Sequence, residues 1–238
     1  MHTIENKVAL ITGGNKGIGY GIAEALVSNN MRVAITSRTQ KAADAAASQL
    51  NKVGKGEAIG IELDVRDAAA QQKAVDLVIK KWDRLDVLIA NAGVGHFGSI
   101  ETLSQGQWNE TIDTNLTGVF YGVKAAVPEL KKSQGYIITI ASLAGTNFFE
   151  GGAAYNASKF GLVGFTQAIM LDLRKHGIKV STIMPGSVAT YFNAHVPSPQ
   201  DDWKIQPEDI GQLVVDLLKM NPRTLPSKIE VRPSIPGK

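Results

Sequence analysis

The sequence predicts an α/β protein in which a doubly wound parallel sheet carries helices on both faces within a single domain. Short runs rich in β-branched residues alternate along the chain with longer stretches of helical period. The short runs are almost continuously apolar, which is typical of strands that are buried on both faces of a parallel sheet. With 238 residues, 44% of them hydrophobic, the chain has the length and composition of one such layered domain.

The predicted strands share this continuous hydrophobicity. They span residues 8–12, 32–37, 58–62, 87–90, 136–141 and 179–184. A further run, residues 228–233, predicts an edge strand, because a proline such as Pro233 is tolerated just past the end of a strand.

Helices are predicted between these strands, where apolar side chains recur every three or four residues. They share one face in three stretches: Ile18, Ile22, Ala25 and Leu26; Val75, Val78, Ile79 and Trp82; and Ile210, Leu213, Val214 and Leu217. The alanine-rich stretch 42–47 predicts another helix, since alanine has the highest helix propensity. The periodicity fails in residues 190–207, which are rich in proline. This segment is expected to be a lid or binding loop, with a disordered surface loop as the alternative.

Charge and composition exclude several classes of protein. The 25 Lys+Arg and 22 Asp+Glu give a net charge of +3, the charges are scattered, and only 6% of residues are aromatic, so no nucleic-acid partner is expected. No apolar run approaches the roughly 20 residues of a spanning helix, and the first residues lack the pattern of a secretion signal. A cytoplasmic chain with no membrane partner is therefore expected. With no Cys there is no disulfide, thiol nucleophile or Cys-based metal centre, and no metal site is expected.

The first predicted strand leads into a glycine-rich turn just before a predicted helix. The turn reads Thr12-Gly13-Gly14-Asn15-Lys16-Gly17-Ile18-Gly19. Glycines allow a tight turn and let the backbone approach a pyrophosphate, whose charge is favoured at the N-terminus of a helix. Ligands of a doubly wound sheet bind outside the carboxyl ends of its strands. The turn therefore predicts a nucleotide site, with a simple tight connection as the alternative.

The end of the second predicted strand indicates which nucleotide. A sheet that binds NAD usually carries Asp or Glu there to accept hydrogen bonds from the adenosine ribose. Ser37 stands at this position, followed by Arg38. Arg38 and Lys16 are two candidate cations for a ribose 2′-phosphate, which predicts NADP(H); the alternative for each is a solvated surface charge.

Tyr155 and Lys159 lie one helical turn apart and face the same way in a predicted helix. A phenol with a pKa of about 10 is a poor acid–base catalyst at neutral pH, but a neighbouring ammonium lowers that pKa by roughly 1–3 units. The pair therefore predicts proton transfer to a carbonyl or from an alcohol. Taken alone, the same spacing also occurs by chance in many helices.

Taken together, these motifs resemble those of the classical short-chain dehydrogenase/reductase family across nearly the whole chain. The glycine turn is similar to the family's T-G-x-x-x-G-x-G, and Tyr155 with Lys159 to its Y-x-x-x-K. The other matches are Asp64 and Val65 after the third strand, Asn91, Ala92 and Gly93 after the fourth, Asn115 in the fourth helix, Ser142 after the fifth strand, and Pro185, Gly186, Val188 and Thr190 after the sixth. Two features depart from the pattern: Ala90 replaces the first Asn of the longer N-N-A-G form, and the C-terminus lacks the Gly-rich ending common in 3-oxoacyl-carrier-protein reductases.

The resemblance implies a Rossmann-type sheet and an NADP(H)-dependent oxidoreductase that interconverts a small-molecule carbonyl and a secondary alcohol, with 3-oxoacyl thioesters as one substrate class. Tyr155 would be the general acid or base. Lys159 would lower the pKa of Tyr155 and hold the nicotinamide ribose. Ser142 would bind the substrate oxygen, and Asn115 would position a relay water. The expected cofactor contacts are Gly13, Asn15, Lys16, Gly17, Ile18, Gly19, Ser37, Arg38, Asp64, Val65, Asn91, Ala92, Gly93, Tyr155, Lys159, Pro185, Gly186, Val188 and Thr190.

Substrate identity is not determined by these motifs. The candidate pocket residues are His96, Phe97, Leu143, Phe148, Phe149, Tyr191 and Phe192. They indicate an apolar pocket, although each Phe can equally belong to the core; His96 is expected at the polar rim. In a different functional class, the alternative is a non-catalytic NADP-binding sensor or scaffold, against which the filled catalytic positions argue.

Family members usually form dimers or tetramers by packing the helices that contain the Asn and Tyr motifs, so a homotetramer is expected, with a dimer as the alternative. The small or apolar residues in these segments are Ala125, Ala126, Ala157, Phe160, Gly161, Gly164 and Phe165. Small residues permit close approach of helices.

Overall fold

The computed structural model describes residues 3–235, and within them seven strands form one parallel sheet in the order β3-β2-β1-β4-β5-β6-β7. The strands are β1 (Val8–Ile11), β2 (Arg32–Ser37), β3 (Glu57–Glu62), β4 (Val87–Ala90), β5 (Tyr136–Ile140), β6 (Lys179–Pro185) and β7 (Lys228–Val231). The helices are α1 (Gly17–Ser28), α2 (Gln40–Val53), α3 (Ala68–Trp82), α4 (Gln105–Ile112), α5 (Gly118–Ser133), α6 (Ala153–Leu173) and α7 (Pro207–Lys219). The predicted doubly wound sheet is confirmed, and the predicted strands differ from these only at their ends.

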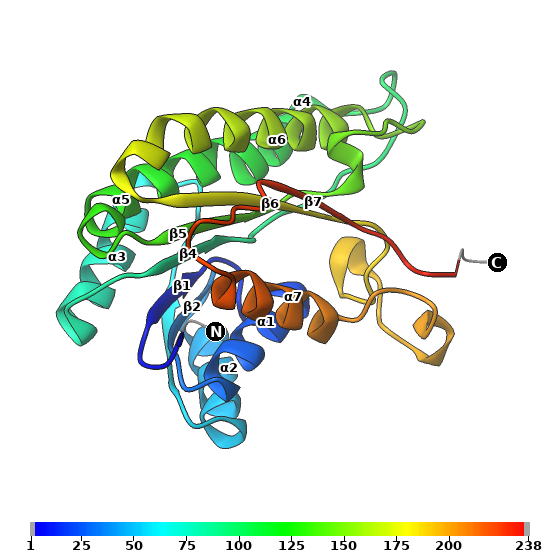
Figure 1. Ribbon diagram of the computed structural model, residues 1–238. Coiled ribbons are helices and arrows are strands. Elements are labelled where there is room, and N and C mark those ends of the chain that lie inside the picture. Colours follow the sequence, from blue (N-terminus) through cyan, green and yellow to red (C-terminus); the bar gives the residue numbers. More distant parts are fainter. Residues whose placement is uncertain (1–2, 236–238) are drawn as a thin grey trace.

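Helices cover both faces of the sheet: α1 and α7 lie on one face, and α5 and α6 on the other (Figure 1). The strands between them are buried on both sides. In β1, Ala9 and Ile11 face the cluster beneath α1 and α7, whereas Val8 and Leu10 face the cluster beneath α3, α5 and α6. This alternation explains why the strand sequences are continuously apolar.

The strand order reverses between β1 and β4. From β1 the chain winds outward through β2 and β3, then returns to β4 and winds the other way through β5, β6 and β7. At such a reversal the loops after neighbouring strands diverge to opposite faces and leave a crevice at the carboxyl edge of the sheet. The glycine turn follows β1 and Asn91 follows β4, so both lie at this edge.

The segment 190–207 lies at the same end of the molecule, on the right in Figure 1. It contains two short 3₁₀ turns, Phe192–Ala194 and Pro199–Asp201. An isolated parallel bridge between Val188 and Ile205 closes its base.

The predicted fourth helix, which was expected to hold Asn115, is interrupted. α4 and α5 are separated by a π turn, Asp113–Thr117, in which the N–H of Gly118 bonds to the carbonyl of Asp113. A π turn inserts one extra residue per turn and so re-aims the side chains that follow it. Asn115 lies in this turn, not in a regular α-helix.

Among residues 3–235, no helix is both long enough and apolar enough to cross a membrane.

Candidate active site

The glycine turn has the backbone conformation that the sequence predicts. Gly13 and Gly17 have φ angles of 65° and 58°, a region that L side chains rarely adopt. The N–H of Gly13 donates to Thr36 Oγ1 over 3.2 Å. Lys16, which precedes α1, provides no side-chain cap for it, so the first N–H groups of this helix remain available for an anion.

Asn91 ties β4 to the glycine turn. Its amide nitrogen Nδ2 donates to the carbonyls of Thr12 and Gly13 over 2.9 and 3.0 Å. The Thr12 hydroxyl in turn accepts the backbone N–H of Asn91 at 3.0 Å and that of Ala92 at 3.1 Å. A side chain at Gly19 would lie 2.5 Å from Asn91 Nδ2, so only glycine fits there. Asn91 therefore sets the shape of the cradle, with Thr12 and Thr36 as supporting residues whose contacts the sequence did not reveal.

The two candidate cations, Lys16 and Arg38, have different neighbours. The Lys16 ammonium sits 5.8 Å from the centre of the Tyr191 ring, on the side of segment 190–207. The positive charge of Arg38 instead acts on Asp64 and contributes to lowering its pKa. Arg38 therefore lies on the side of the loop that follows β3.

Asp64 is paired with Arg66, a residue that sequence reasoning missed. Arg66 Nε donates to both carboxylate oxygens of Asp64, over 3.0 and 3.1 Å, and this contact is the main reason that the Asp64 pKa is lowered. The N-cap of α3 is Asp67, which accepts the N–H groups of Ala69 and Ala70, so Asp64 does not cap this helix.

Lys159 is a buried ammonium. It is 5% exposed, and its Nζ donates to the Ile140 carbonyl over 3.0 Å at the end of β5. Burial lowers the pKa of Lys159 to about 8. The same Nζ lies 5.6 Å from the centre of the Tyr155 ring, one turn earlier on α6.

The pKa of Tyr155 is raised above its ordinary value, whereas the sequence predicted a lowered one. Burial raises the pKa, and a hydrogen bond with the Ser142 hydroxyl offsets part of that effect. Desolvation disfavours the phenolate, and it is the larger of the two effects on this group. The phenol of Tyr155 therefore carries its proton at neutral pH.

Ser142 follows β5 and caps the 3₁₀ turn Leu143–Gly145. Its Oγ accepts the N–H of Ala144 over 3.1 Å. This contact leaves the hydroxyl proton free to donate. The Ser142 side chain also lies near enough to the Tyr155 phenol to lower its pKa, so the two hydroxyl-bearing side chains belong to the same site.

The Asn115 side chain is fully engaged with its surroundings. Its Oδ1 accepts the N–H of Val94 and its Nδ2 donates to the Val94 carbonyl, both over 2.8 Å. Nδ2 also donates to Ser158 Oγ over 3.0 Å, and Ser158 donates to the Tyr155 carbonyl over 2.8 Å. Asn115 therefore ties the loop after β4 to the first turn of α6. No motif in the sequence indicated a role for Ser158.

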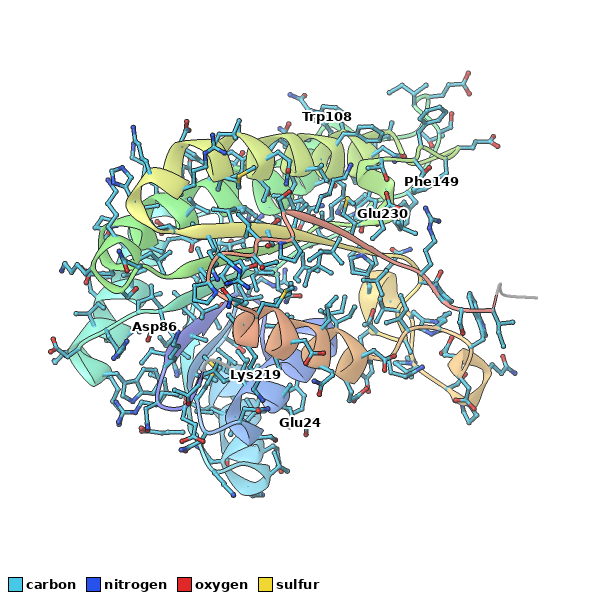
Figure 2. All side chains as sticks on the ribbon, viewed as in Figure 1. Glu24, Asp86, Trp108, Phe149, Lys219 and Glu230 are labelled. Atoms are coloured by element: carbon cyan, nitrogen blue, oxygen red, sulfur yellow. The ribbon has the colours of Figure 1, made fainter. Side chains whose placement is uncertain are left out.

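Two phenylalanine rings lie against the Tyr155 ring, and a third packs on one of them. The ring centre of Phe97 lies 5.4 Å from that of Tyr155, and the ring centre of Phe192 lies 5.7 Å from it. Phe149 packs on Phe97 at 5.8 Å. Figure 2 shows Phe149 on the side of the molecule where segment 190–207 projects. These rings form the aromatic wall of the site, composed of Phe97, Phe149 and Phe192.

The other candidate pocket residues are placed less uniformly. Phe148 is 86% exposed, and Tyr191 lies under Lys16. His96 is bonded to Glu110 of α4 through Nε2 over 2.8 Å. The structure brings Leu143 close to the backbone of Gly186, beside the segment that follows β6.

The residues at this edge fit a dinucleotide cofactor. A side chain built at Gly17 would meet only Thr190, at 3.4 Å, so the glycine turn and the segment after β6 face each other. Among residues 3–235, no cluster of His, Asp and Glu could hold a metal ion. The donors present are backbone N–H groups, hydroxyls and an ammonium, which suit phosphate and ribose groups.

The chain belongs to the short-chain dehydrogenase family, whose model matches residues 7–201. A trans-4-hydroxycyclohexanecarboxylate dehydrogenase of Sinomonas cyclohexanicum is 37% identical over 196 residues, covering 80% of this chain and 76% of the relative. A 3-oxoacyl-acyl-carrier-protein reductase of Buchnera aphidicola is 39% identical over 196 residues, covering 82% and 78%. An alcohol dehydrogenase structure from the archaeon Thermococcus sibiricus, complexed with 5-hydroxy-NADP, superposes with a TM-score of 0.91 at 28% identity, covering 97% of each chain.

Proposed function

We propose that this protein is an NADP(H)-dependent oxidoreductase that interconverts a carbonyl group and a secondary alcohol. The observation that carries the proposal is the placement of Ser142 close enough to the Tyr155 phenol to affect its pKa, with the Lys159 ammonium 5.6 Å from the centre of the Tyr155 ring. A bound nicotinamide would supply the hydride in reduction and accept it in oxidation. The protein's part is to hold the substrate oxygen and move a proton.

Tyr155 would be the general acid in the direction of reduction. Its raised pKa keeps the phenol protonated, so the proton is present when a carbonyl oxygen gains negative charge. The Ser142 hydroxyl would donate a second hydrogen bond to the same oxygen and stabilise the alkoxide as it forms. In oxidation the same groups would act in reverse, with Tyr155 as the base.

Lys159 would limit the penalty for forming the phenolate. With a pKa of about 8 it is mainly an ammonium at neutral pH, and a positive charge near the ring favours the phenolate once the proton has left. Asn115 keeps the loop after β4 against α6. We also propose that a water beside Asn115 and Lys159 relays protons to solvent.

NADP(H) is the proposed cofactor because Ser37 ends β2 where a NAD enzyme usually carries a carboxylate, and Arg38 follows it directly. Arg38 has no close carboxylate partner within residues 3–235, so its guanidinium is available to a 2′-phosphate. The related structure complexed with 5-hydroxy-NADP supports this choice.

The proposed substrate is an apolar carbonyl compound. The aromatic wall lies beside the Tyr155 ring, and aromatic side chains favour burial of hydrocarbon. The two relatives act on a substituted cyclohexane and on a 3-oxoacyl carrier. The C-terminus lacks the Gly-rich ending that is common in 3-oxoacyl-carrier-protein reductases. This difference favours a carbonyl reductase in general, with a 3-oxoacyl thioester reductase as one subclass.

The experiment is to incubate the protein with NADPH or NADH and a panel of cyclic ketones, diketones and 3-oxoacyl thioesters while following the absorbance of the reduced nicotinamide. Turnover with at least one compound and faster oxidation of NADPH are expected. Binding of NADPH without turnover on any compound would favour the non-catalytic sensor instead.

Assembly into a homo-oligomer is also proposed, through the outer face of α5 and α6. This face carries an apolar groove lined by Phe120, Val123, Lys124, Val127, Phe165, Ile169, Asp172 and Leu173. Of the small residues expected at the interface, Ala125 and Ala126 are buried in the protein's own core and are not available to a partner. Phe160 is half-exposed, and space around Gly164 is open.

A further inference from the structure

The segment between β6 and α7 is a closed loop. At its base, the N–H of Ala189 donates to the Ile205 carbonyl over 2.9 Å and the N–H of Ile205 donates to the Ser187 carbonyl over 3.1 Å. Between these points the chain leaves the sheet, and Phe192 reaches back to the Tyr155 ring. A loop with joined ends keeps its shape only if its own side chains fill and bond its interior.

One carboxylate holds the interior of this loop. Asp201 is buried; its Oδ2 accepts His195 Nε2 at 2.7 Å and the N–H of Ser198 at 2.9 Å. Its Oδ1 pairs with Lys204 Nζ at 2.5 Å. Lys204, Ser198 and His195 together hold the pKa of Asp201 well below its usual range, so the clasp operates as a carboxylate. We call Asp201, His195, Ser198 and Lys204 the Asp201 clasp.

The turn between Phe192 and the clasp is strained. Asn193 and Ala194 have φ angles of 53° and 60°, and two consecutive non-glycine residues in this left-handed region are unfavourable. Such a turn persists only where its neighbours hold it. On one side Phe192 packs against Tyr155 and Phe97, and on the other His195 is bonded to Asp201.

We propose that Asp201 is a positioning residue for substrate binding, because its hold on His195 keeps the strained turn folded and Phe192 against the Tyr155 ring. The proposal rests on the carbonyl reductase function proposed above. If the clasp is broken, only a fraction of molecules has the aromatic wall in place. The apparent affinity for the carbonyl substrate falls by that fraction, whereas a bound substrate still finds Tyr155 and Ser142 in place.

The first test compares variants of the clasp. Asp201→Asn should raise the KM for the best ketone of the panel about tenfold, since the charge that assists the bond to His195 is lost, and should change kcat less than about threefold. His195→Ala should do the same while leaving Lys204 and Ser198 on Asp201, so it remains informative if Asp201→Asn fails to fold. His195→Gln keeps an N–H donor and should restore a KM within about threefold of the wild type.

Asp202→Asn is the matched control. Asp202 is an exposed neighbour that takes no side-chain hydrogen bond or ion pair within residues 3–235, and this variant removes the same charge one position away. Its KM should equal that of the wild type. An equal rise in Asp202→Asn and Asp201→Asn would mean that net charge, not the clasp, sets the affinity, and would overturn the proposal.

A double-mutant cycle tests whether the clasp acts through Phe192. In a Phe192→Leu background, Asp201→Asn should raise KM by less than about twofold further, because the ring that it positions has already been removed. Full additivity of the two effects would contradict the proposal.

A protease experiment separates the clasp from the proposed function. Chymotrypsin cleavage after Phe192 or Trp203, located by mass spectrometry, should be about tenfold faster in His195→Ala than in the wild type, because cleavage follows the population of the open loop. Equal cleavage rates would overturn the clasp whatever the enzyme's activity. Faster cleavage with an unchanged KM would overturn the positioning role, and absence of turnover in the wild type alone would instead refute the proposed function.

Discussion

The most constrained side chain at the residue scale is Lys159. Its ammonium is buried and has one carbonyl, that of Ile140, within hydrogen-bond reach among residues 3–235. A buried cation without a carboxylate partner is destabilising, which is why the pKa of Lys159 falls to about 8. This unfavourable placement is expected where a charge is needed for chemistry and not for stability.

The lowered pKa predicts how stability depends on pH. The folded-state pKa of Lys159 is about 8 and the ordinary value is 10.5, so between these values the unfolded chain binds more protons. The free energy of unfolding contributed by this group therefore rises with pH across that window. Relative to Lys159→Met, the wild type should gain about 1–2 kcal/mol between pH 7.5 and pH 9.5 in urea unfolding of the cofactor-free protein. Lys131→Met, at an exposed position of α5, should show no such difference; an equal response in both variants would contradict the buried ammonium.

We expect Arg38 to set the preference for NADPH over NADH. With Ser37 in place of a carboxylate, NADPH should be preferred over NADH by about 30- to 150-fold in kcat/KM, and Arg38→Ala should erase most of that preference while leaving the NADH rate nearly unchanged. Added salt should reduce the preference. The measurement is kcat/KM with both cofactors, using Lys73→Ala on α3 as a control for loss of an exposed charge. Equal wild-type values for NADPH and NADH would refute the role of Arg38.

Among the elements, the glycine turn depends most directly on close packing. Asn91 joins it to β4 through two amide hydrogen bonds, and Gly19 leaves room for that amide. The turn, the end of β4 and the start of α1 are therefore one packed unit. Contacts within the chain itself define its shape.

Gly19→Ala should disrupt this unit. The new methyl group would lie 2.5 Å from both Asn91 Nδ2 and the Gly13 carbonyl, so we expect a loss of about 2–4 kcal/mol in the free energy of unfolding and a marked loss of NADPH affinity. Gly106→Ala, where a methyl group meets no atom closer than 3.9 Å, should be neutral or stabilise by up to about 1 kcal/mol. Chemical denaturation and fluorescence titration with NADPH would measure both. Normal NADPH binding by Gly19→Ala would show that the turn does not form the cradle.

The elements also show how far the sequence could predict the structure. The strands were predictable because burial on both faces makes them continuously apolar, as in β1. The π turn at Asn115 was not predictable. Asn115 bonds to Val94 and Ser158, which lie far from it in the sequence, and hydrophobic periodicity reports only on local structure. The phenylalanines of the aromatic wall were among the predicted pocket residues. Which of them pack at the site, Phe97, Phe149 and Phe192 and not Phe148, depends on the conformation of the loops, which the sequence pattern does not predict. The Asp201 clasp lies in the segment where periodicity fails.

At the scale of the whole molecule, the strand order gathers the site. The glycine turn, Asn91, Ser142 and Thr190 follow β1, β4, β5 and β6, which all end at the same edge of the sheet. α6 then brings Tyr155 and Lys159 to that edge from one face. Residues that are far apart in the sequence thus lie at one edge of the sheet, because each follows the carboxyl end of its own strand.

The outer face of α5 and α6 is the expected site of self-association. Light scattering at micromolar concentration should find a mass that is a multiple of 25.4 kDa, with a tetramer favoured. Phe120→Glu would place a charge in the apolar groove and should shift the protein toward the monomer. Leu77→Glu, at an exposed position of α3, should not. A wild type that is monomeric throughout would contradict the proposed assembly.

The most direct test of the account concerns the Tyr155 hydroxyl. Tyr155→Phe keeps the ring that packs against Phe97 and Phe192 and removes only the proposed proton donor. Turnover of NADPH with the best carbonyl substrate should fall by about 10²–10⁴-fold, with NADPH binding largely preserved. A variant that retained more than about a tenth of wild-type turnover, at a rate limited by chemistry, would contradict the assignment of Tyr155 as the general acid.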